Sequence, residues 1–294
     1  MTEHEDYASK ILAETARITR ITKAREKTGR VLMVTGRGGT GKSTFTALAS
    51  RFLKPPLLLC DIDPDQSLGS MLGIDLEATS IKTEIGREVP IKTISDLTTA
   101  IEDEDALMEL GGGDLTVKLP MLLQWYTQYR SEKFDLISLG PKWTEGDYRS
   151  ANFLFEFIVP NIGKEYTHIV IDSPAGLEHL NRRVVGKVHD LFVVVDPSAK
   201  SLKHVERVKK ITERVGIKYE HLYIIGNHEF DKKTEQMFTV TGETYLGKMA
   251  FDKRVREYNL KSKSLWKLPP DSPACISVRE ILGRAGLLQT ANDN

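Results

Sequence analysis

Residues 36–44 read Gly-Arg-Gly-Gly-Thr-Gly-Lys-Ser-Thr, and this stretch decides the fold. It fits the phosphate-binding pattern G-x-x-x-x-G-K-[ST]. Glycines let successive backbone N–H groups curl around phosphate oxygens, and a following helix points its positive end at the same phosphates. Lysine adds a cation for the β and γ phosphates, and the serine hydroxyl is a Mg²⁺ ligand. We call residues 36–44 the phosphate loop. The residues expected to contact phosphate are Gly38, Gly39, Thr40, Gly41, Lys42, Ser43 and Thr44.

The sequence on either side of the phosphate loop has the pattern that the motif requires. Residues 31–35 form a short apolar run that predicts a buried strand, and residues 45–53 have the apolar spacing of a helix. The alternative is a glycine-rich turn with an accidental Gly-Lys-Ser. A strand, a glycine loop and a helix in that order favour a nucleotide-binding loop.

Apolar strands alternate with helices through most of the remaining chain, which predicts an α/β fold with a mainly parallel sheet flanked by helices. Ligands of such sheets bind at the carboxyl ends of the strands. We expect the further strands at residues 57–63, 134–139, 168–172, 191–196 and 222–227. The polar residues at their ends are Asp61, Asp63, Asp172, Asp196 and Asn227.

Composition bounds the domain organisation and the class of partner. The chain has 294 residues, of which 40% are hydrophobic, enough for one large domain at residues 30–294. Apolar spacing over residues 3–27 predicts a helix, so residues 1–29 are expected to form an N-terminal helical extension. Lysine plus arginine equals aspartate plus glutamate, 41 each, which argues against a strong electrostatic nucleic-acid binder and leaves a local basic patch as the alternative.

The same composition indicates a cytoplasmic protein. No apolar run reaches the length of a membrane span, and the first thirty residues lack the apolar centre of a secretory signal. The two cysteines, Cys60 and Cys275, provide no disulfide framework.

Asp172 closes an apolar run in the manner of the Mg²⁺-associated acid of nucleotide hydrolases, which holds the metal through a water. Residues 172–176, Asp-Ser-Pro-Ala-Gly, then form a loop suited to sensing a γ-phosphate. The alternative is an acid that caps the next helix.

Several motifs together resemble one family. Residues 37–43 resemble the deviant phosphate loop K-G-G-x-G-K-[ST] of the MinD/ParA/nitrogenase-iron-protein ATPases. Residues 61–64, Asp-Ile-Asp-Pro, resemble the first switch of that family, and residues 172–176 its second switch. The resemblance covers residues 30–288. It implies a P-loop ATPase that hydrolyses Mg-ATP and dimerises face to face, with two nucleotides buried between the subunits.

The resemblance also assigns roles to individual residues. Arg37 stands where the family has a signature lysine that reaches the partner's phosphates, and it keeps the charge with bidentate geometry. The alternative is a solvated arginine at the edge of the loop. Asp63 resembles the acid that positions the attacking water. Ser43, Asp61 and Asp172 are the expected metal set.

The part of the chain that resembles the family's base-binding region departs from the family's pattern at two positions. Asn227 resembles the asparagine that reads adenine, but His228 follows it where arginine is usual. Residues 246–252 resemble the loop I-P-x-D after the last strand, with Asp252 in place and Ala250 instead of proline. The alternatives are a turn asparagine and a helix-capping aspartate.

Residues 135–152 resemble the segment that carries a C-x-C pair in CooC-type ATPases, which help to load nickel into carbon monoxide dehydrogenase. Gly146, Tyr148 and Asn152 match, but Asp147 and Arg149 occupy the cysteine positions. Thiolates select metals such as nickel or zinc, so we expect no such site here. The segment is then a surface loop or a docking element.

Other branches of the family fit less well. Cys60 lies within a strand and Cys275 near the carboxyl end, unlike ligands of a cluster shared across a dimer. Residues 276–288 predict a short helix with few cations, which favours core packing over a membrane anchor.

The sequence thus predicts a cytoplasmic, Mg-ATP-dependent dimeric ATPase switch of the CooC-like branch. Its expected partners are a second copy of the chain and a client protein such as a metalloenzyme. The alternative is a MinD/ParA-like positioning or regulatory ATPase that binds a protein partner without carrying metal.

Overall fold

The computed structural model describes residues 29–74, 129–140, 165–181, 186–239 and 242–288, together with the pairs 81–82, 88–89 and 93–94. The predicted helix at residues 3–27 and the residues 141–152 of the C-x-C-like segment lie outside this part of the chain. The domain boundary at residue 30 therefore stays a prediction.

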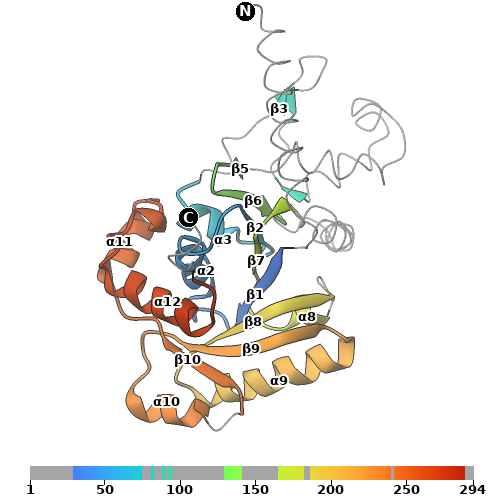
Figure 1. Ribbon diagram of the computed structural model, residues 1–294, viewed down its shortest axis with the longest axis vertical. Coiled ribbons are helices and arrows are strands. Elements are labelled where there is room, and N and C mark those ends of the chain that lie inside the picture. Colours follow the sequence, from blue (N-terminus) through green and yellow to red (C-terminus); the bar gives the residue numbers. More distant parts are fainter. Residues whose placement is uncertain are drawn as a thin grey trace, which may run out of the picture.

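The described residues form an eight-stranded sheet in the order β10-β9-β8-β1-β7-β2-β6-β5 (Figure 1). Seven of these strands run parallel, and β5 pairs antiparallel with β6 at one edge. In that order the strands are Thr244–Lys248, Lys218–Gly226, Lys187–Val195, Arg30–Gly36, His168–Asp172, Leu57–Asp61, Phe134–Ser138 and Tyr129–Arg130. A separate antiparallel pair joins β3 (Ile81–Lys82) to β4 (Glu88–Val89). The predicted parallel α/β sheet is confirmed.

Two strand boundaries, those of β2 and β10, differ from the predicted ones. Strand β2 ends at Asp61 instead of residue 63, because the Asp61 carboxylate accepts from the Asp63 N–H (3.1 Å) and turns the chain. Residues 246–248 belong to β10, so the predicted loop at 246–252 begins at residue 249. Only Leu246 of β10 is buried, and the strand therefore lacks the apolar run that marks the others.

Helices cover both faces of the sheet. Helix α9 (Ala199–Val215) runs along β9 on one side, whereas α2 (Lys42–Ser50) and α12 (Pro273–Arg284) lie on the other (Figure 1). The remaining helices are α3 (Ser67–Met71), α8 (Glu178–Asn181), α10 (Lys232–Thr239), α11 (Lys253–Leu260) and the 3₁₀ turn η3 (Leu265–Lys267).

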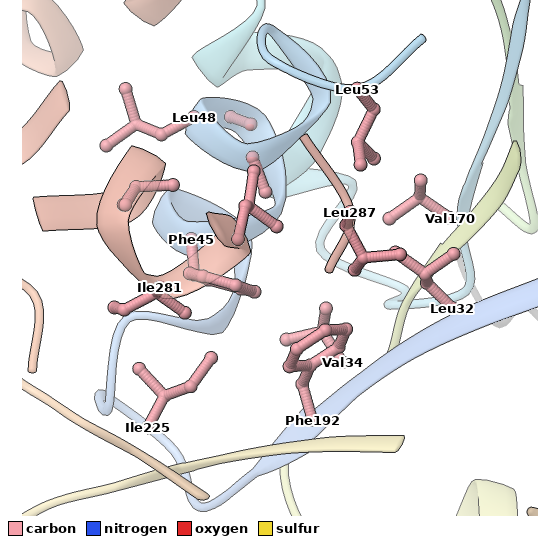
Figure 2. Packing of buried hydrophobic residues seen from close by; sticks show 14 of the residues in the cluster. Leu32, Val34, Phe45, Leu48, Leu53, Val170, Phe192, Ile225, Ile281 and Leu287 are labelled. Atoms are coloured by element: carbon pink, nitrogen blue, oxygen red, sulfur yellow. The ribbon is translucent and has the colours of Figure 1, made fainter. Parts of the chain in front are cut away.

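Alternate residues of the central strands face two hydrophobic layers. Val31 and Met33 pack in the layer that contains Val205 and Val208 of α9. The other layer joins α2 and α12 to the sheet, and burial of each of its large side chains contributes about 1.5–3 kcal/mol. Figure 2 labels members of this second layer, among them Leu32, Val34, Phe45, Leu48, Phe192, Ile225 and Ile281.

Polar contacts hold the far end of α2 against η3. The Trp266 Nε1–H donates to the Ala47 backbone oxygen and to Ser50 Oγ, at 3.0 Å each. The Arg51 Nη1 donates to the Leu268 backbone oxygen at 2.6 Å. These bonds fix the helix that follows the phosphate loop, so the loop stands on a rigid support.

Helix α12 has the core-packing role expected of the predicted helix at 276–288. It begins at Pro273, and it buries Cys275, Val278 and Ile281 against the sheet. Cys60 is also fully buried, and burial raises the pKa of its thiol. Within the described part of the chain, no helix has both the length and the apolar character of a membrane span.

Candidate functional site

The phosphate loop joins β1 to α2 in a backbone shape that only glycine allows. A Cβ at Gly36 would lie 2.3 Å from the Val194 backbone oxygen on the adjacent strand β8. Gly41 is the N-cap of α2 with φ of 94°, and a glycine has no side chain to accept from the first-turn N–H groups. Those N–H groups and the positive end of α2 therefore remain available for an anion.

Lys42 lies folded over the phosphate loop. Its ammonium group donates to the Arg37 backbone oxygen at 3.1 Å, and the Thr40 hydroxyl donates to the same oxygen at 2.9 Å. Burial lowers the pKa of Lys42, whereas the carboxylates of Asp172 and Asp63 raise it. The structure thus brings the predicted lysine and two of the predicted acids within electrostatic reach of one another.

Asp61 and Asp172 lie side by side because β2 and β7 pair in a register that places them opposite each other. Asp61 is fully buried, and its two carboxylate oxygens accept from the N–H groups of Asp63 (3.1 Å) and Leu68 (3.0 Å). Burial and the charge of Asp172 hold the pKa of Asp61 well above its usual range. Asp61 therefore organises the turn that carries Asp63.

Asp172 has one carboxylate oxygen engaged and one without a partner among the described residues. Its Oδ1 accepts from the Thr46 hydroxyl at 3.0 Å, whereas Oδ2 is buried and unpaired. Burial raises the pKa of Asp172, and the hydroxyls of Ser43 and Thr46 and the charge of Lys42 lower it. A serine hydroxyl beside an unpaired carboxylate oxygen fits Mg²⁺, which prefers hard oxygen ligands and keeps several waters.

The loop at residues 172–176 is hydrogen-bonded to the phosphate loop and to β1. The Gly176 N–H donates to the Gly36 backbone oxygen (3.2 Å), and the Ser173 N–H donates to the Val34 backbone oxygen (3.2 Å). His179, at the start of α8, lies 3.1 Å from the Thr35 hydroxyl through Nε2. These contacts join the phosphate loop and β1 to the segment that follows β7.

His179 is a residue that sequence reasoning missed. Burial and the charges of Lys42 and His204 lower its pKa to about 3, so the ring is neutral at physiological pH. A single histidine in a polar stretch gives no sequence signal, and its importance follows from the contact with Thr35.

The Arg37 guanidinium forms hydrogen bonds with side chains of its own chain. Its Nη1 donates to Asp196 Oδ2 at 3.0 Å and to Ser198 Oγ at 3.2 Å. Asp196 follows β8 and also accepts from the hydroxyls of Ser198 and Ser201. Burial raises the pKa of Asp196, but the two hydroxyls and Arg37 outweigh it, and the net pKa is lowered. Arg37 is thus a paired residue here rather than a solvated edge.

The two predicted base-reading residues make local contacts. Asn227 Oδ1 accepts from the Glu229 N–H at 3.1 Å, which is a side-chain turn. Asp252 caps α11 by accepting from the Arg254 N–H at 3.0 Å, and it pairs with the Arg254 guanidinium. Both local roles that the sequence left open are therefore present, and base reading by these residues stays a prediction.

A cavity of about 590 Å³ opens beside the phosphate loop. Its lining comes from the phosphate loop, including Gly39, Gly41 and Thr44, from Leu48 of α2, from the residues after β9 and β10, from α11 and from Ala274 of α12. This volume lies within the range of small-molecule sites. No group of three or more histidine, cysteine, aspartate or glutamate side chains placed to hold a metal ion occurs in the described ranges.

Comparison with known proteins identifies several ATP-binding relatives. No protein-family profile matches the sequence. The chain is 28% identical over 257 residues to the uncharacterized ATP-binding protein MJ0685 of Methanocaldococcus jannaschii, covering 85% of this chain and 96% of the relative. It is 25% identical over 196 residues to the carbon monoxide dehydrogenase accessory protein CooC of Rhodospirillum rubrum, covering 64% and 70%. The septum site-determining protein MinD of Thermotoga maritima is 27% identical over 216 residues, covering 72% and 69%.

Homologues of the chain include ATP-binding proteins of the MinD/ParA family. Solved structures of this family share the fold. A ParA family ATPase from Chlorobium tepidum superposes with a TM-score of 0.63 at 20% identity, covering 87% of this chain and 98% of its own. The cell division ATPase MinD of Pyrococcus furiosus gives 0.58 at 17% identity, covering 88% and 98%. The family resemblance expected from the motifs is confirmed, and CooC is a distant homologue within it.

Proposed function

We propose that the protein is a Mg-ATP-dependent ATPase that acts as a dimeric switch. The observation that carries this proposal is the glycine-capped amino end of α2, with Lys42 over the loop and two buried acids on the neighbouring strands. The names of the relatives as ATP-binding proteins support ATP as the ligand.

The residues of the site then have distinct tasks. The N–H groups of residues 38–44 bind the phosphates, and Lys42 exchanges the Arg37 backbone oxygen for phosphate oxygens. Asp63 holds the attacking water, because phosphoryl transfer needs positioned charge more than covalent chemistry. Ser43 would hold Mg²⁺ with Asp172, through a water, and with Asp61 nearby. When bound, the metal neutralises charge on the phosphates.

Dimerisation supplies a second cation. In this proposal Arg37 leaves Asp196 and Ser198 when ATP binds, and it reaches the phosphates held by the partner subunit. Its planar fork suits that task, and cations that act in this way contribute strongly to phosphoryl transfer.

The client is proposed from the relationship to CooC, whose name assigns it to carbon monoxide dehydrogenase. The closed dimer would dock on a metalloenzyme in the cytoplasm without carrying nickel itself, since Asp147 and Arg149 stand in place of the cysteine pair. A second candidate follows from that substitution. Without thiolates, the chain also fits a MinD-like regulator that binds a protein partner and no metal.

Titration calorimetry with Ni²⁺, with and without Mg-ATP, tests whether metal is carried. We expect no sub-micromolar site. Tight binding that disappears in Asp147→Ala would restore the metal-carrier role, and tight binding that disappears in Cys60→Ser or Cys275→Ser would place the metal elsewhere.

Phosphate release from ATP tests the enzymatic part. Wild-type protein should hydrolyse Mg-ATP, and Lys42→Ala should abolish turnover because the β and γ phosphates lose their cation. The matched control is Lys203→Ala, which removes an exposed lysine of α9. Equal loss of activity in both variants, or unchanged turnover in Lys42→Ala, would contradict the assignment.

A further inference from the structure

The last residues of three neighbouring strands form a row of polar side chains. The pairing of β7, β2 and β6 places Asp172 beside Asp61 and Asp61 beside Ser138. Two positions earlier, each strand contributes an apolar residue to the second hydrophobic layer, namely Val170, Leu59 and Leu136. Because side chains of a strand alternate between the two faces, the three polar groups lie on the α2 side of the sheet. Neighbouring strands are about 4.8 Å apart, so each member of the row adjoins the next.

Backbone hydrogen bonds fix the register of this row. The Ile62 N–H donates to the Asp172 backbone oxygen at 3.0 Å, and the Leu139 N–H donates to the Asp61 backbone oxygen at 2.7 Å. The side chains of Asp172, Asp61 and Ser138 are all fully buried. Ser138 is therefore held beside Asp61, away from water, by the same ladder that aligns the two acids.

The Ser138 hydroxyl has no hydrogen-bond partner among the described residues. A serine hydroxyl carries one O–H donor, and leaving a buried donor unpaired is costly. The neighbouring Asp61 carboxylate accepts from the N–H groups of Asp63 and Leu68, one to each oxygen. Each carboxylate oxygen has two lone pairs, so Asp61 can also accept from Ser138 after a rotation about the Ser138 Cα–Cβ bond.

We propose that Ser138 is a positioning residue for ATP hydrolysis, which donates to the Asp61 carboxylate in the ATP-bound state and thereby holds the turn that carries Asp63. This inference rests on the proposed ATPase function and adds a residue that no sequence motif indicates. Asp63 has to hold the attacking water within a narrow range of positions, and its backbone N–H is anchored on Asp61. A carboxylate held by three donors leaves that turn less freedom than one held by two. Ser138 acts on the reaction only through Asp61.

Ser138→Ala separates this role from a packing role. In nucleotide-free protein the variant loses no hydrogen bond, so its midpoint of urea unfolding should equal or exceed that of wild type. Single-turnover phosphate release from pre-bound Mg-ATP should nevertheless be about tenfold slower, the loss expected for one hydrogen bond to a charged group. The dissociation constant of Mg-ATP, measured by titration calorimetry, should stay within about twofold of the wild-type value.

Ser272→Ala is the matched control, because it removes an equally buried hydroxyl that is paired. The Ser272 hydroxyl caps α12 by accepting from the Cys275 N–H at 3.2 Å. Loss of this cap should lower the midpoint of urea unfolding and leave the rate of phosphate release unchanged. Ser138→Thr keeps the hydroxyl, and it should release phosphate within about twofold of the wild-type rate.

The Asp63→Ala background tests whether Ser138 acts through this turn. Because the two residues would belong to one unit, Ser138→Ala should slow phosphate release by less than about twofold there. A second loss as large as that in the wild-type background, or unchanged phosphate release in Ser138→Ala alone, would overturn this inference. An unfolding midpoint lowered as in Ser272→Ala would also overturn it, since the hydroxyl would then be paired in the free protein. Wild-type protein that binds no ATP, or that releases no phosphate from it, would instead refute the proposed function.

Discussion

Arg37 Nη1 lies 3.0 Å from Asp196 Oδ2, so the arginine at the family's signature position is held by its own chain. Both side chains are partly exposed, at 35% and 23%, and such a pair contributes only about 0.2–1 kcal/mol. The contact is therefore strong enough to orient the guanidinium and weak enough to be exchanged for phosphate. This makes the pair a candidate gate between a single chain and a dimer.

Asp196→Asn should favour ATP-dependent dimerisation, because it removes the charge that competes with phosphate for Arg37. The dimer dissociation constant, measured by light scattering over a protein dilution series with Mg-ATP, should fall by up to about 30-fold, because two such pairs open per dimer. Glu213→Gln removes an exposed acid from α9, the helix that follows Asp196, and should change nothing. Weaker dimerisation in Asp196→Asn would mean that this acid holds Arg37 in its active position.

Mixing two inactive variants distinguishes an arginine that acts on its own site from one that acts on the partner's site. In a dimer of one Arg37→Ala and one Asp63→Ala subunit, a trans arginine leaves one site with both groups intact. Phosphate release should therefore recover on mixing, although each variant alone is slow. If Arg37 acts in its own subunit, each mixed site lacks one group and mixing recovers nothing.

Asp63→Ala should bind ATP normally and hydrolyse it on the order of 100-fold more slowly, as expected for loss of a group that positions and activates water. Single-turnover phosphate release with pre-bound ATP measures the step. The control is Asp65→Ala, which removes a neighbouring exposed carboxylate in the same turn. Normal turnover in Asp63→Ala would transfer the water-positioning role to another residue.

The buried ring of His179 should make the folded state sensitive to acid. Its folded pKa is lowered to about 3, below the ordinary histidine value, so the unfolded chain binds the extra proton first. Stability is therefore fully present above about pH 6.5 and falls by up to about 1.4 kcal/mol per pH unit as the pH drops toward 3.

Denaturant unfolding at pH 7.5 and pH 5.5 checks this prediction. His179→Gln keeps a polar group near Thr35 but cannot titrate, and it should lose less stability between the two pH values than wild type. His228→Gln changes an exposed ring and should lose as much as wild type. Identical losses in all three proteins would show that His179 does not set the acid sensitivity.

The central sheet and the position of the phosphate loop between β1 and α2 could be predicted because both have strong local signals. A run such as residues 168–172 is apolar throughout and ends in an acid, and glycines before Lys42 have one common use. Strand β10 and helix α11 could not be predicted from an apolar pattern. Strand β10 buries only Leu246, and α11 has no buried residue.

Contacts between residues far apart in the chain also could not be predicted from the sequence. The contacts of Arg37 with Asp196 and of His179 with Thr35 join residues more than a hundred positions apart, and no local pattern marks them. The cavity also could not be predicted, because its lining combines the phosphate loop with α11, and these two segments lie far apart in the sequence. The phosphate-loop motif can thus be recognised from local sequence, whereas the contacts that surround it depend on the tertiary structure.

The molar mass of Asp63→Ala in solution tests the central claim most directly, because slow hydrolysis should trap the ATP-bound state. Light scattering should give the 33.1 kDa mass of one chain without nucleotide and with Mg-ADP, and twice that mass with Mg-ATP. Lys42→Ala should stay at the single-chain mass throughout. A single-chain mass for Asp63→Ala with ATP bound, shown by nucleotide that co-elutes with the protein, would contradict the ATP-driven dimer.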